Sequence, residues 1–561
     1  MVNDFFQQGP KLENQYAEDR ILKSYLRRVL PESTLKEIES DLLHMGERAA
    51  TDLIDLAESA EKNRPKHIPF DSWGTRIDKI ETSPEWKALD RISAEEKLIA
   101  IGYERKQGVY SRIYQFAKLY LFHPSSAMYT CPLAMTDGAA RVIELYGDDL
   151  MKASVYPHLI SSDPDFFWTS GQWMTEKTGG SDVATTSTTA NARLRYGEYE
   201  LFGTKWFTSA TTSQIALTLA RTDTAQSGGK HLSLFYIKLK DSAEKLNNIR
   251  VRRLKDKLGT WALPTAELEL TGTPATLIGG EGDGIKKISA LFNITRIYNA
   301  CCAIGNMRRA LALTQNYAVK RIAFGRPLNE QSLHVETLSD LQVEFEACFQ
   351  LTFKTVELLG KDELGQTSPG EHALLRLLTP IAKLYTAKKA ISLTSEVLES
   401  FGGAGYIEDT GLPKLLRDSQ VLSIWEGTTN VLSLDVLRAL DKENAGPPFF
   451  EDVKNRLSKI STPELKNFVR IAEDATHETE SFFHSLSSIE PEDQQAAARH
   501  FSMTLAKLYS TSLLIEQADW ALRVEKDRRP TLVLSRWCER HLVELISSSK
   551  SRREDSRKIF F

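Results

Sequence analysis

The stretch ESFGGAGYIEDTGLPKLLRD, residues 399–418, places three glycines within four positions directly after a long helical pattern. The residues before it, HALLRLLTPIAKLYTAKKAISLTSEVLES, space their apolar side chains as a helix does. Gly402 and Gly403 are typical of a helix C-terminus, because glycine adopts the left-handed conformation there without steric cost. Two interpretations stay open for this stretch: a flexible loop, or a backbone that a large ligand approaches closely.

Immediately downstream, VLSIWEGTTNV (residues 421–431) sets one carboxylate, Glu426, between Trp425 and Gly427. The apolar run before the acid looks like a strand, and small polar residues follow it. Such a glutamate is either a solvated loop residue or, in a dry pocket, a base of raised proton affinity.

Two segments upstream carry cations in unusual surroundings. In KRIAFGRPL (residues 320–328) three basic residues surround Phe324, which predicts a phosphate-binding corner at the end of a helix. In FNITRIYNA (residues 292–300) Arg296 lies among apolar residues of a predicted helix. It is either a surface or ion-paired arginine, or a guanidinium that holds an anionic ligand.

A glycine-rich segment, WMTEKTGGSDV (residues 173–183), lies in a part of the chain with β character. Its glycines permit a tight turn and its hydroxyls, Thr175 and Ser181, could hold the phosphates or the ring edge of a cofactor. The plain alternative is a hairpin turn. Farther on, GTKWFTS offers Trp206 as a stacking surface, although a core tryptophan on a strand is the simpler reading.

Changes in the spacing of apolar residues along the chain predict an α+β multidomain protein with four domains. Residues 1–160 show helical spacing and predict an N-terminal helical domain, and residues 161–284 alternate in short runs that predict a middle β-barrel or sheet domain. Residues 285–440 return to long helical periods and predict a helical bundle. Residues 441–561 predict a C-terminal helical extension, near whose start GPP at positions 446–448 is interpreted as a linker.

Composition excludes several classes of protein. A chain of 561 residues with 41% hydrophobic and 26% charged residues is ordinary for a globular protein, and 75 acids against 71 bases give a net charge of −4. No global positive field therefore favours nucleic acid, although the last dozen residues are basic. No apolar run is long enough for a membrane span. The five scattered cysteines predict reduced, mostly buried thiols rather than disulfides or a metal site.

The ends of the sequence show no targeting pattern. MVNDFFQQGPKLENQYAEDR lacks the apolar core of a signal peptide and the Arg/Ser bias of a transit peptide, and the ending SRKIFF is neither a prenylation box nor a peroxisomal signal. We expect a cytoplasmic protein, with a mitochondrial location as the alternative.

Across about residues 15–440 the chain resembles the acyl-CoA dehydrogenase flavoprotein family. TEKTGGSDV is similar to the family's first signature, T-E-x-x-x-G-S-D, and residues 399–418 satisfy its second signature throughout. KWFTS, FNITR and KRIAFGRPL resemble the flavin-stacking W-I-T, the CoA-binding D-x-x-R and the R-x-x-F-G-x-x-L of the family, in the family's order. NQYAEDRIL, DSWGTRIDKIETSPEW, CPLAMTDGAA and the helical extension resemble its AidB-like subgroup.

The resemblance implies FAD as the cofactor and a medium- to long-chain fatty acyl-CoA as the substrate, in fatty-acid β-oxidation or lipid metabolism. Glu426 matches the catalytic base of the family's Y-E-G-T. It would remove the α-proton from the substrate while the β-hydrogen leaves as hydride to flavin N5, giving a trans-2-enoyl-CoA. Some relatives carry the base at the position of Thr295, which cannot act as one here.

The family's contact positions are carried over residue by residue. Flavin contacts are implied for Met174, Thr175, Gly180, Ser181, Trp206, Phe207, Thr208, Gly427, Thr428 and Asn430, and, from a neighbouring subunit, for Arg321, Phe324, Gln331, Glu399, Ser400, Phe401, Gly402 and Gly403. Substrate contacts are implied for Ser181, Asn293, Arg296 and Glu426. Cofactor sites shared between subunits imply a homotetramer, and the family implies an electron-transfer flavoprotein as acceptor.

Three positions depart from the family pattern. Asn293 replaces the usual Asp of D-x-x-R, which affects the fine CoA contacts, and Glu399 stands where many members have Gln. Trp425 stands where many have Tyr or Phe, and its bulk is expected to narrow or reshape the acyl pocket.

Two other functions stay open: an FAD-containing protein that binds acyl-CoA with little turnover, and an AidB-like DNA-binding stress protein.

Overall fold

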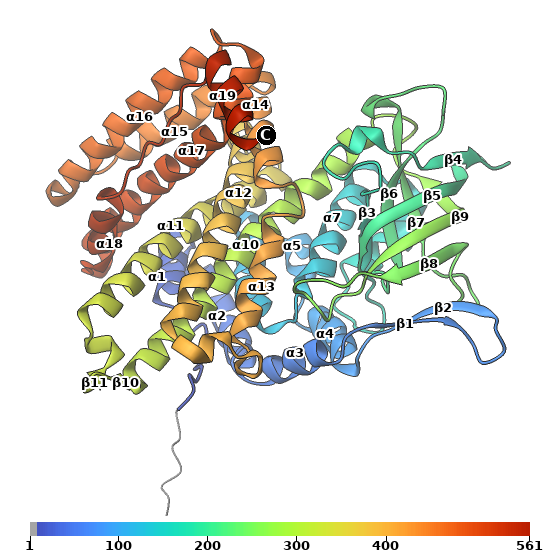
Figure 1. Ribbon diagram of the computed structural model, residues 1–561, viewed down its shortest axis with the longest axis horizontal. Helices are drawn as coiled ribbons and strands as arrows, with labels where there is room; N and C mark the ends of the chain where they lie inside the picture. The colour runs from blue at the N-terminus through green and yellow to red at the C-terminus, as the bar shows by residue number, and fades with distance from the viewer. Residues whose placement is uncertain (1–7) are drawn as a thin grey trace, which may run out of the picture. The chain divides into compact units, whose positions relative to one another are not determined.

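The computed structural model describes residues 8–561 and divides into two compact units (Figure 1). The helical unit comprises residues 8–47, Gln107–Tyr120 and Asn299–Phe561, and the mixed unit comprises Arg48–Lys106 and Leu121–Tyr298. This division follows spatial packing rather than sequence order. The four domains predicted from the sequence stay a prediction.

The mixed unit is built on a seven-stranded sheet. Its strands are β3 (Ser170–Trp173), β4 (Thr189–Ala192), β5 (Glu198–Ser209), β6 (Ile215–Arg221), β7 (Leu232–Lys238), β8 (Ile249–Leu254) and β9 (Thr265–Leu277). Their order is β3-β6-β4-β5-β9-β7, β8 pairs with β9, and a further β6–β7 pairing closes the ring (Figure 1). Alternate residues of these strands, such as Leu201, Phe235 and Leu268, fill the interior. The middle β-barrel predicted from the sequence is confirmed.

Helices complete the mixed unit. They are α3 (Asp52–Lys62), α4 (Pro84–Glu95), α5 (Ala100–Glu104), α7 (Thr130–Tyr146), α8 (Asp149–Ser154) and α9 (Tyr156–Leu159). A hairpin of β1 (Lys66–Phe70) and β2 (Arg76–Glu81) interrupts the N-terminal segment. The sequence analysis took that segment for mostly helical and missed the hairpin, because its alternation is short and its apolar residues are largely exposed.

The helical unit is a bundle of long helices. Its members before the extension are α1 (Arg20–Val29), α2 (Glu32–Arg48), α6 (Ser111–Phe122), α11 (Ser332–Glu363), α12 (Pro369–Ser400), α13 (Leu412–Leu422) and α14 (Thr429–Lys442), and α10 (Gly284–Lys320) supplies residues to both units. Helix α12 begins with a capping box between Ser368 and Glu371 and ends before Gly402, whose φ is +61°. The helix stop predicted there is confirmed.

The C-terminal extension adds α15 (Gly446–Ser458), α16 (Lys466–Leu486), α17 (Pro491–Trp520), α18 (Arg529–Cys538) and α19 (Lys550–Phe560). The interpretation of GPP at 446–448 as a linker was wrong. These residues form the first turn of α15, where a proline loses no helical hydrogen bond, and Gly446 packs against Phe483.

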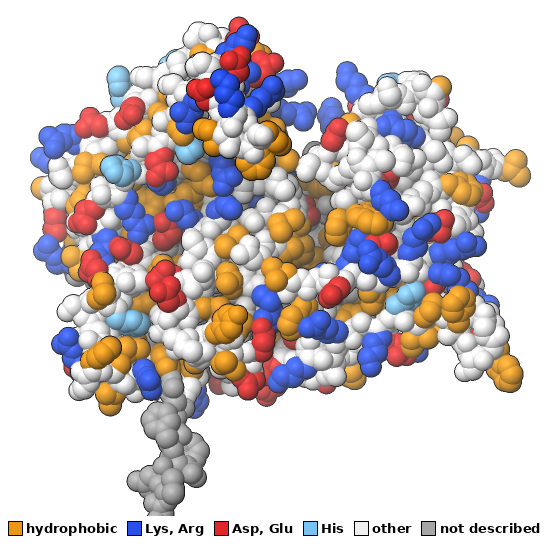
Figure 2. Space-filling model, viewed as in Figure 1, with side chains coloured by type: hydrophobic (Ala, Val, Ile, Leu, Met, Phe, Trp, Pro, Cys, Tyr) orange, Lys and Arg blue, Asp and Glu red, His pale blue; other side chains and the backbone are white. Residues whose placement is uncertain are grey.

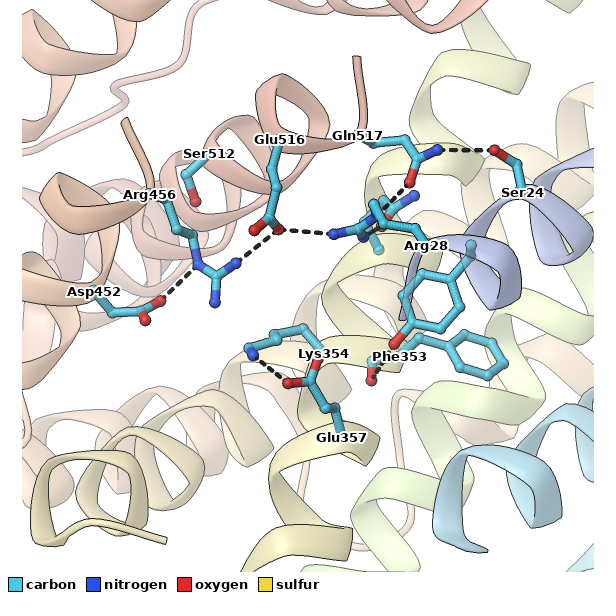
Figure 3. Close-up of polar contacts among 12 residues, drawn as sticks. Ser24, Arg28, Phe353, Lys354, Glu357, Asp452, Arg456, Ser512, Glu516 and Gln517 are labelled. Atoms are coloured by element: carbon cyan, nitrogen blue, oxygen red, sulfur yellow. Dashed lines mark hydrogen bonds and ion pairs between the residues drawn. The ribbon is translucent and has the colours of Figure 1, made fainter. Parts of the chain in front are cut away.

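A chain of charged side chains joins the extension to the bundle (Figure 3). The Glu516 carboxylate on α17 accepts from Arg28 of α1 at 2.9 Å and from Arg456 of α15 at 2.8 Å. Arg456 also donates to Asp452 at 2.8 Å, and Arg28 donates to Gln517 at 2.7 Å. Both guanidinium groups are largely buried, so Glu516 compensates two positive charges that water does not reach freely.

Replacing this bridging carboxylate tests how the extension is held. Glu516→Gln is expected to lower the free energy of unfolding by about 2 kcal/mol, because two charge-assisted hydrogen bonds are weakened and two arginines are left facing one another. Urea denaturation followed by far-UV circular dichroism measures the loss. The matched control is Glu480→Gln, which removes a surface partner of Lys454 and is expected to change stability by less than about 1 kcal/mol. Equal losses in both variants would contradict the prediction.

The surface of the helical unit carries charges of both signs: on the face drawn in Figure 2, basic and acidic side chains intermingle over its helices. All five cysteines are free thiols, four of them buried, as predicted, and burial raises the pKa of Cys301 and Cys348 far above the usual thiol value. Within residues 8–561, no helix has both the length and the apolar character needed to cross a membrane.

Candidate active site

The glycine-rich segment forms a tight turn at the end of β3. Glu176 and Gly179 exchange backbone hydrogen bonds of 3.0 and 3.3 Å, which close the turn. Gly180 follows it, exposed, and a Cβ atom there would come within 3.0 Å of the Thr175 methyl carbon. The turn therefore offers a bare, accessible backbone, and the exposed Ser181 hydroxyl lies beside it.

A buried ion pair fastens the turn to β5. The Glu176 carboxylate accepts from Lys205 Nζ at 2.8 Å and from the backbone N–H and hydroxyl of Ser187 at 2.7 and 2.6 Å. The Trp206 N–H donates to Thr175 O at 2.9 Å. Both charged side chains are almost fully buried. The structure thereby brings two segments predicted to contact the flavin together within one unit.

The pKa of Glu176 follows from these contacts. Burial alone would raise it, but the Lys205 ammonium and the hydroxyls of Ser187 and Thr188 lower the pKa of Glu176 to about 2. Because the folded pKa is depressed, the stability that this carboxylate contributes is present above its ordinary pKa of 4.5 and is lost as the pH falls towards about 2.

This linkage gives a pH-dependent prediction. Between about pH 5 and pH 2 the free energy of unfolding of the wild type is expected to fall more steeply than that of Glu176→Gln, whose amide does not titrate. Denaturant unfolding at a series of pH values, followed by tryptophan fluorescence, measures the two slopes. Identical slopes over that range would contradict the prediction. Glu244→Gln, which removes a largely exposed carboxylate of the same unit, serves as the control.

Trp206 lies on β5 with positive charge close to its ring. Lys255 Nζ is 3.7 Å from the ring centroid and Lys177 Nζ is 4.8 Å from it. The indole is partly exposed and Phe207 is largely exposed, so both rings can be reached by a ligand. The two lysines were not singled out from the sequence. Lys177 is part of the TEKTGG turn and Lys255 is part of the basic segment RLKDK, and these locations are the sequence signals that could have indicated them.

Two of the predicted flavin contacts turn their side chains inward. Met174 is buried, and the buried Thr208 hydroxyl donates to Ala266 O at 2.6 Å. At these two positions the contact with a cofactor is therefore left to the backbone and, for Thr208, to the second lone pair of the hydroxyl.

Arg296 and Asn293 lie one helical turn apart on the part of α10 that belongs to the mixed unit, and both side chains are partly exposed. Thr295 between them is buried and its hydroxyl donates to Phe292 O at 3.1 Å. The guanidinium and the amide thus share a face, as recognition of an anionic ligand requires.

Glu426 lies in the helical unit, in the turn between α13 and α14. The strand-like interpretation of residues 421–425 was wrong: Val421 and Leu422 end α13, and Thr428 caps α14 by accepting from Val431 N at 3.5 Å. Over only five residues, the apolar pattern of a strand cannot be distinguished from that of the last turn of a partly buried helix. Glu426 has φ +55° and Gly427 has φ +99°, so the turn is left-handed at both.

The surroundings of Glu426 are less dry than the sequence analysis expected. Its side chain is partly exposed, and Ile424 is exposed. Trp425 is held in place instead: its indole N–H donates to Asn299 Oδ1, and Asn299 Nδ2 donates to Leu422 O at 2.9 Å.

The remaining predicted contacts also lie in the helical unit. The corner after α10 is a short hairpin of β10 (Ile322–Ala323) and β11 (Arg326–Pro327), in which Phe324 is fully exposed and Gln331 Nε2 donates to Ala323 O at 2.9 Å. Phe401, directly after α12, is buried and its ring centroid lies 4.6 Å from that of Tyr317 on α10. Arg499 of the extension donates to Asn430 Oδ1 at 3.3 Å. Position by position, the helical unit holds Arg321, Phe324, Gln331, Glu399–Gly403 and Glu426–Asn430.

The donor set fits a flavin dinucleotide rather than a metal. An extended, planar and anionic group suits this site. The partly exposed Trp206 indole has two lysines near its ring, and the glycine-rich turn offers an accessible backbone and hydroxyl groups. Within the described part of the chain, no group of three His, Cys, Asp or Glu side chains is arranged to hold a metal ion.

Comparison with family models matches the chain in four parts. Residues 8–165 match the adaptive response protein AidB N-terminal domain, 171–273 the acyl-CoA dehydrogenase middle domain, 282–440 the acyl-CoA dehydrogenase C-terminal domain, and 447–559 the acyl-CoA dehydrogenase 11 C-terminal domain-like family.

Known proteins match along most of the chain. The acyl-CoA dehydrogenase family member 11 of Caenorhabditis elegans is 43% identical over 557 residues, covering 96% of this chain and 90% of that protein. The putative acyl-CoA dehydrogenase AidB of Escherichia coli K12 is 32% identical over 418 residues, covering 72% and 75%. The crystal structure of C. elegans ACDH-11 in complex with C11-CoA superposes with a TM-score of 0.96 at 41% identity, covering 100% of this chain and 97% of that one. These matches confirm the resemblance, including its AidB-like character.

Proposed function

We propose that this chain, which belongs to the acyl-CoA dehydrogenase family of flavoprotein oxidoreductases, oxidises the α,β carbon–carbon bond of a medium- to long-chain fatty acyl-CoA to a trans-2-enoyl-CoA. The related C. elegans protein is described with C11-CoA, which lies within this range of chain lengths and supports the substrate class.

The observation that carries the proposal is the placement of Glu426. A carboxylate in a left-handed turn, with its neighbour Trp425 held by Asn299, has a fixed backbone from which to reach a substrate. In the proposed reaction Glu426 takes the proton of the α C–H bond, and the β C–H bond breaks with its electron pair leaving on hydrogen. The double bond forms between the two carbons, and Glu426 ends the step protonated.

FAD is the proposed cofactor, and when bound it accepts the hydride from the β-carbon. Thr175, Gly180, Ser181 and Trp206 would hold it in the mixed unit, and Arg296 with Asn293 would hold the CoA end of the substrate. The positions around Arg321, Gln331 and Glu399–Gly403 would contact the cofactor from a neighbouring subunit. Gly427, Thr428 and Asn430 complete the proposed cofactor contacts.

The proposed assembly and redox partner follow from the family. We propose a homotetramer, supported by the fully exposed Phe324, which a subunit contact would cover, and an electron-transfer flavoprotein as the acceptor. A cytoplasmic location is proposed, with a mitochondrial one as the alternative.

Anaerobic titration of the purified, FAD-loaded protein tests the function. A series of saturated acyl-CoA thioesters from short to long chains, with C11-CoA among them, is added while the flavin absorbance is followed. Bleaching by acyl-CoA but not by free CoA, with an enoyl-CoA product identified by mass spectrometry, is the expected result. Tight binding by calorimetry with no bleaching at any chain length would overturn it and favour an acyl-CoA-binding protein instead.

A further inference from the structure

A buried lysine on α12 binds the turn that carries Glu426. The Lys383 side chain is fully buried, and its Nζ donates to Trp425 O at 2.8 Å and to Gly427 O at 2.6 Å. The two carbonyl groups are those that flank Glu426 in the chain. Lys383 and Glu426 belong to the same unit, although they lie far apart in sequence.

The backbone that Lys383 binds is in an unfavourable conformation. Glu426 has φ +55°, a region that is sterically unfavourable for a residue with a Cβ atom, and Gly427 has φ +99°. Such a conformation persists where the surroundings hold it. An ammonium that donates to both neighbouring carbonyls does this, since charge-assisted hydrogen bonds are about twice as strong as neutral ones.

Two further contacts hold the ends of the turn. Asn299 holds the Trp425 indole and Leu422 O on the α13 side, and the Thr428 hydroxyl caps α14 on the other. The carbonyls of Trp425 and Gly427 point to one atom, Lys383 Nζ. The orientation of the two peptide planes around Glu426, and with it the direction of its Cα–Cβ bond, is therefore set from α12.

We propose that Lys383 is the positioning residue of the base: its ammonium locks the Trp425–Gly427 turn so that the Glu426 carboxylate meets the α-carbon of the substrate. This inference rests on the proposed function, because it assigns to Lys383 the geometry that proton removal needs. Lys383 does not touch the reacting atoms and acts through Glu426.

The expected consequence is a loss of rate without a loss of binding. A displacement of about 1 Å at a reacting group lowers a rate by about 100-fold. Lys383→Met, similar in length but without charge, is expected to slow anaerobic flavin bleaching by about that factor, while the Kd for acyl-CoA changes less than about 3-fold. Lys383→Arg keeps the charge with a different shape and is expected to lose about 10-fold.

A second readout separates positioning from general damage. Exchange of the substrate α-hydrogens with D2O, measured by NMR on enzyme whose flavin was reduced beforehand, reports proton removal without hydride transfer, and should slow in parallel with bleaching. Amide hydrogen exchange of the 424–428 segment, measured by mass spectrometry, should accelerate in Lys383→Met. The matched control is Lys118→Met, which removes another buried lysine of the helical unit, paired with Asp41, and should leave both rates within about 2-fold.

The outcomes distinguish this inference from the function it rests on. A wild-type protein that binds acyl-CoA but never bleaches overturns the proposed function. A wild type that bleaches, together with a Lys383→Met that bleaches and exchanges at the wild-type rate, overturns the positioning role and leaves the function intact. If Lys383→Met fails to fold, Lys383→Arg decides, and a wild-type rate in that variant overturns the role.

Discussion

Glu426→Gln is expected to slow the reduction of the flavin by acyl-CoA about a thousand-fold. Glutamine keeps the size and hydrogen-bonding reach of the side chain but cannot take a proton from the α-carbon, and a positioned general base contributes about 10² to 10⁴ to a rate. Anaerobic stopped-flow absorbance in the flavin bands measures the bleaching rate, and equilibrium titration measures acyl-CoA binding, which is expected to persist.

A nearby carboxylate supplies the control for this variant. Glu443 follows α14 and pairs with Arg376, so Glu443→Gln removes a carboxylate from the same part of the fold without touching the turn. It is expected to bleach at nearly the wild-type rate. Bleaching of Glu426→Gln at a rate comparable to that of Glu443→Gln would show that another group removes the proton.

Lys205→Met is expected to give the largest loss of stability, about 3–5 kcal/mol. The substitution leaves the Glu176 carboxylate buried without its cation. The desolvation penalty of this charged group is then no longer offset by the attraction to Lys205, and this lowers the free energy of unfolding. Guanidinium denaturation, followed by tryptophan fluorescence, is the measurement. Because the pair also fastens the Glu176–Gly179 turn, which is proposed to hold FAD, to β5, weaker retention of FAD on gel filtration should accompany the loss.

The double variant Glu176→Gln with Lys205→Met tests whether the cost comes from the stranded charge. The amide oxygen of the glutamine can still accept hydrogen bonds from Ser187 and Thr188, so the double variant should be more stable than Lys205→Met alone. If the double variant is less stable than the single one, the loss comes from packing and the ion-pair argument fails.

Local sequence was sufficient for features that one short segment decides. The helix stop at the glycines after α12, the strand character of β5 and β6 and the turn at TEKTGG were predicted correctly, because backbone freedom and side-chain pattern act over a few residues. The family signature at residues 399–418 likewise lies in one stretch and is sufficient to indicate the fold class.

Local sequence misled where two structures share a pattern or where packing overrides it. Residues 421–425 look like a strand but end a helix, and Pro447 and Pro448 look like a linker but begin one. In both cases tertiary contacts select among backbones that the segment alone permits. The β1–β2 hairpin was missed because its apolar residues are not buried in one face.

By itself, the sequence determined the fold class of this protein, the carboxylate proposed as its base and the segments proposed to hold its cofactor, since each is written in contiguous residues. Only the tertiary structure decided that Lys205 neutralises Glu176 in the glycine-rich turn, that Glu516 bridges Arg28 and Arg456, and that Lys383 binds the carbonyls on both sides of Glu426. These contacts join residues far apart along the chain. No local pattern indicates them, because a buried charge chooses its partner by proximity in space and by the cost of leaving water.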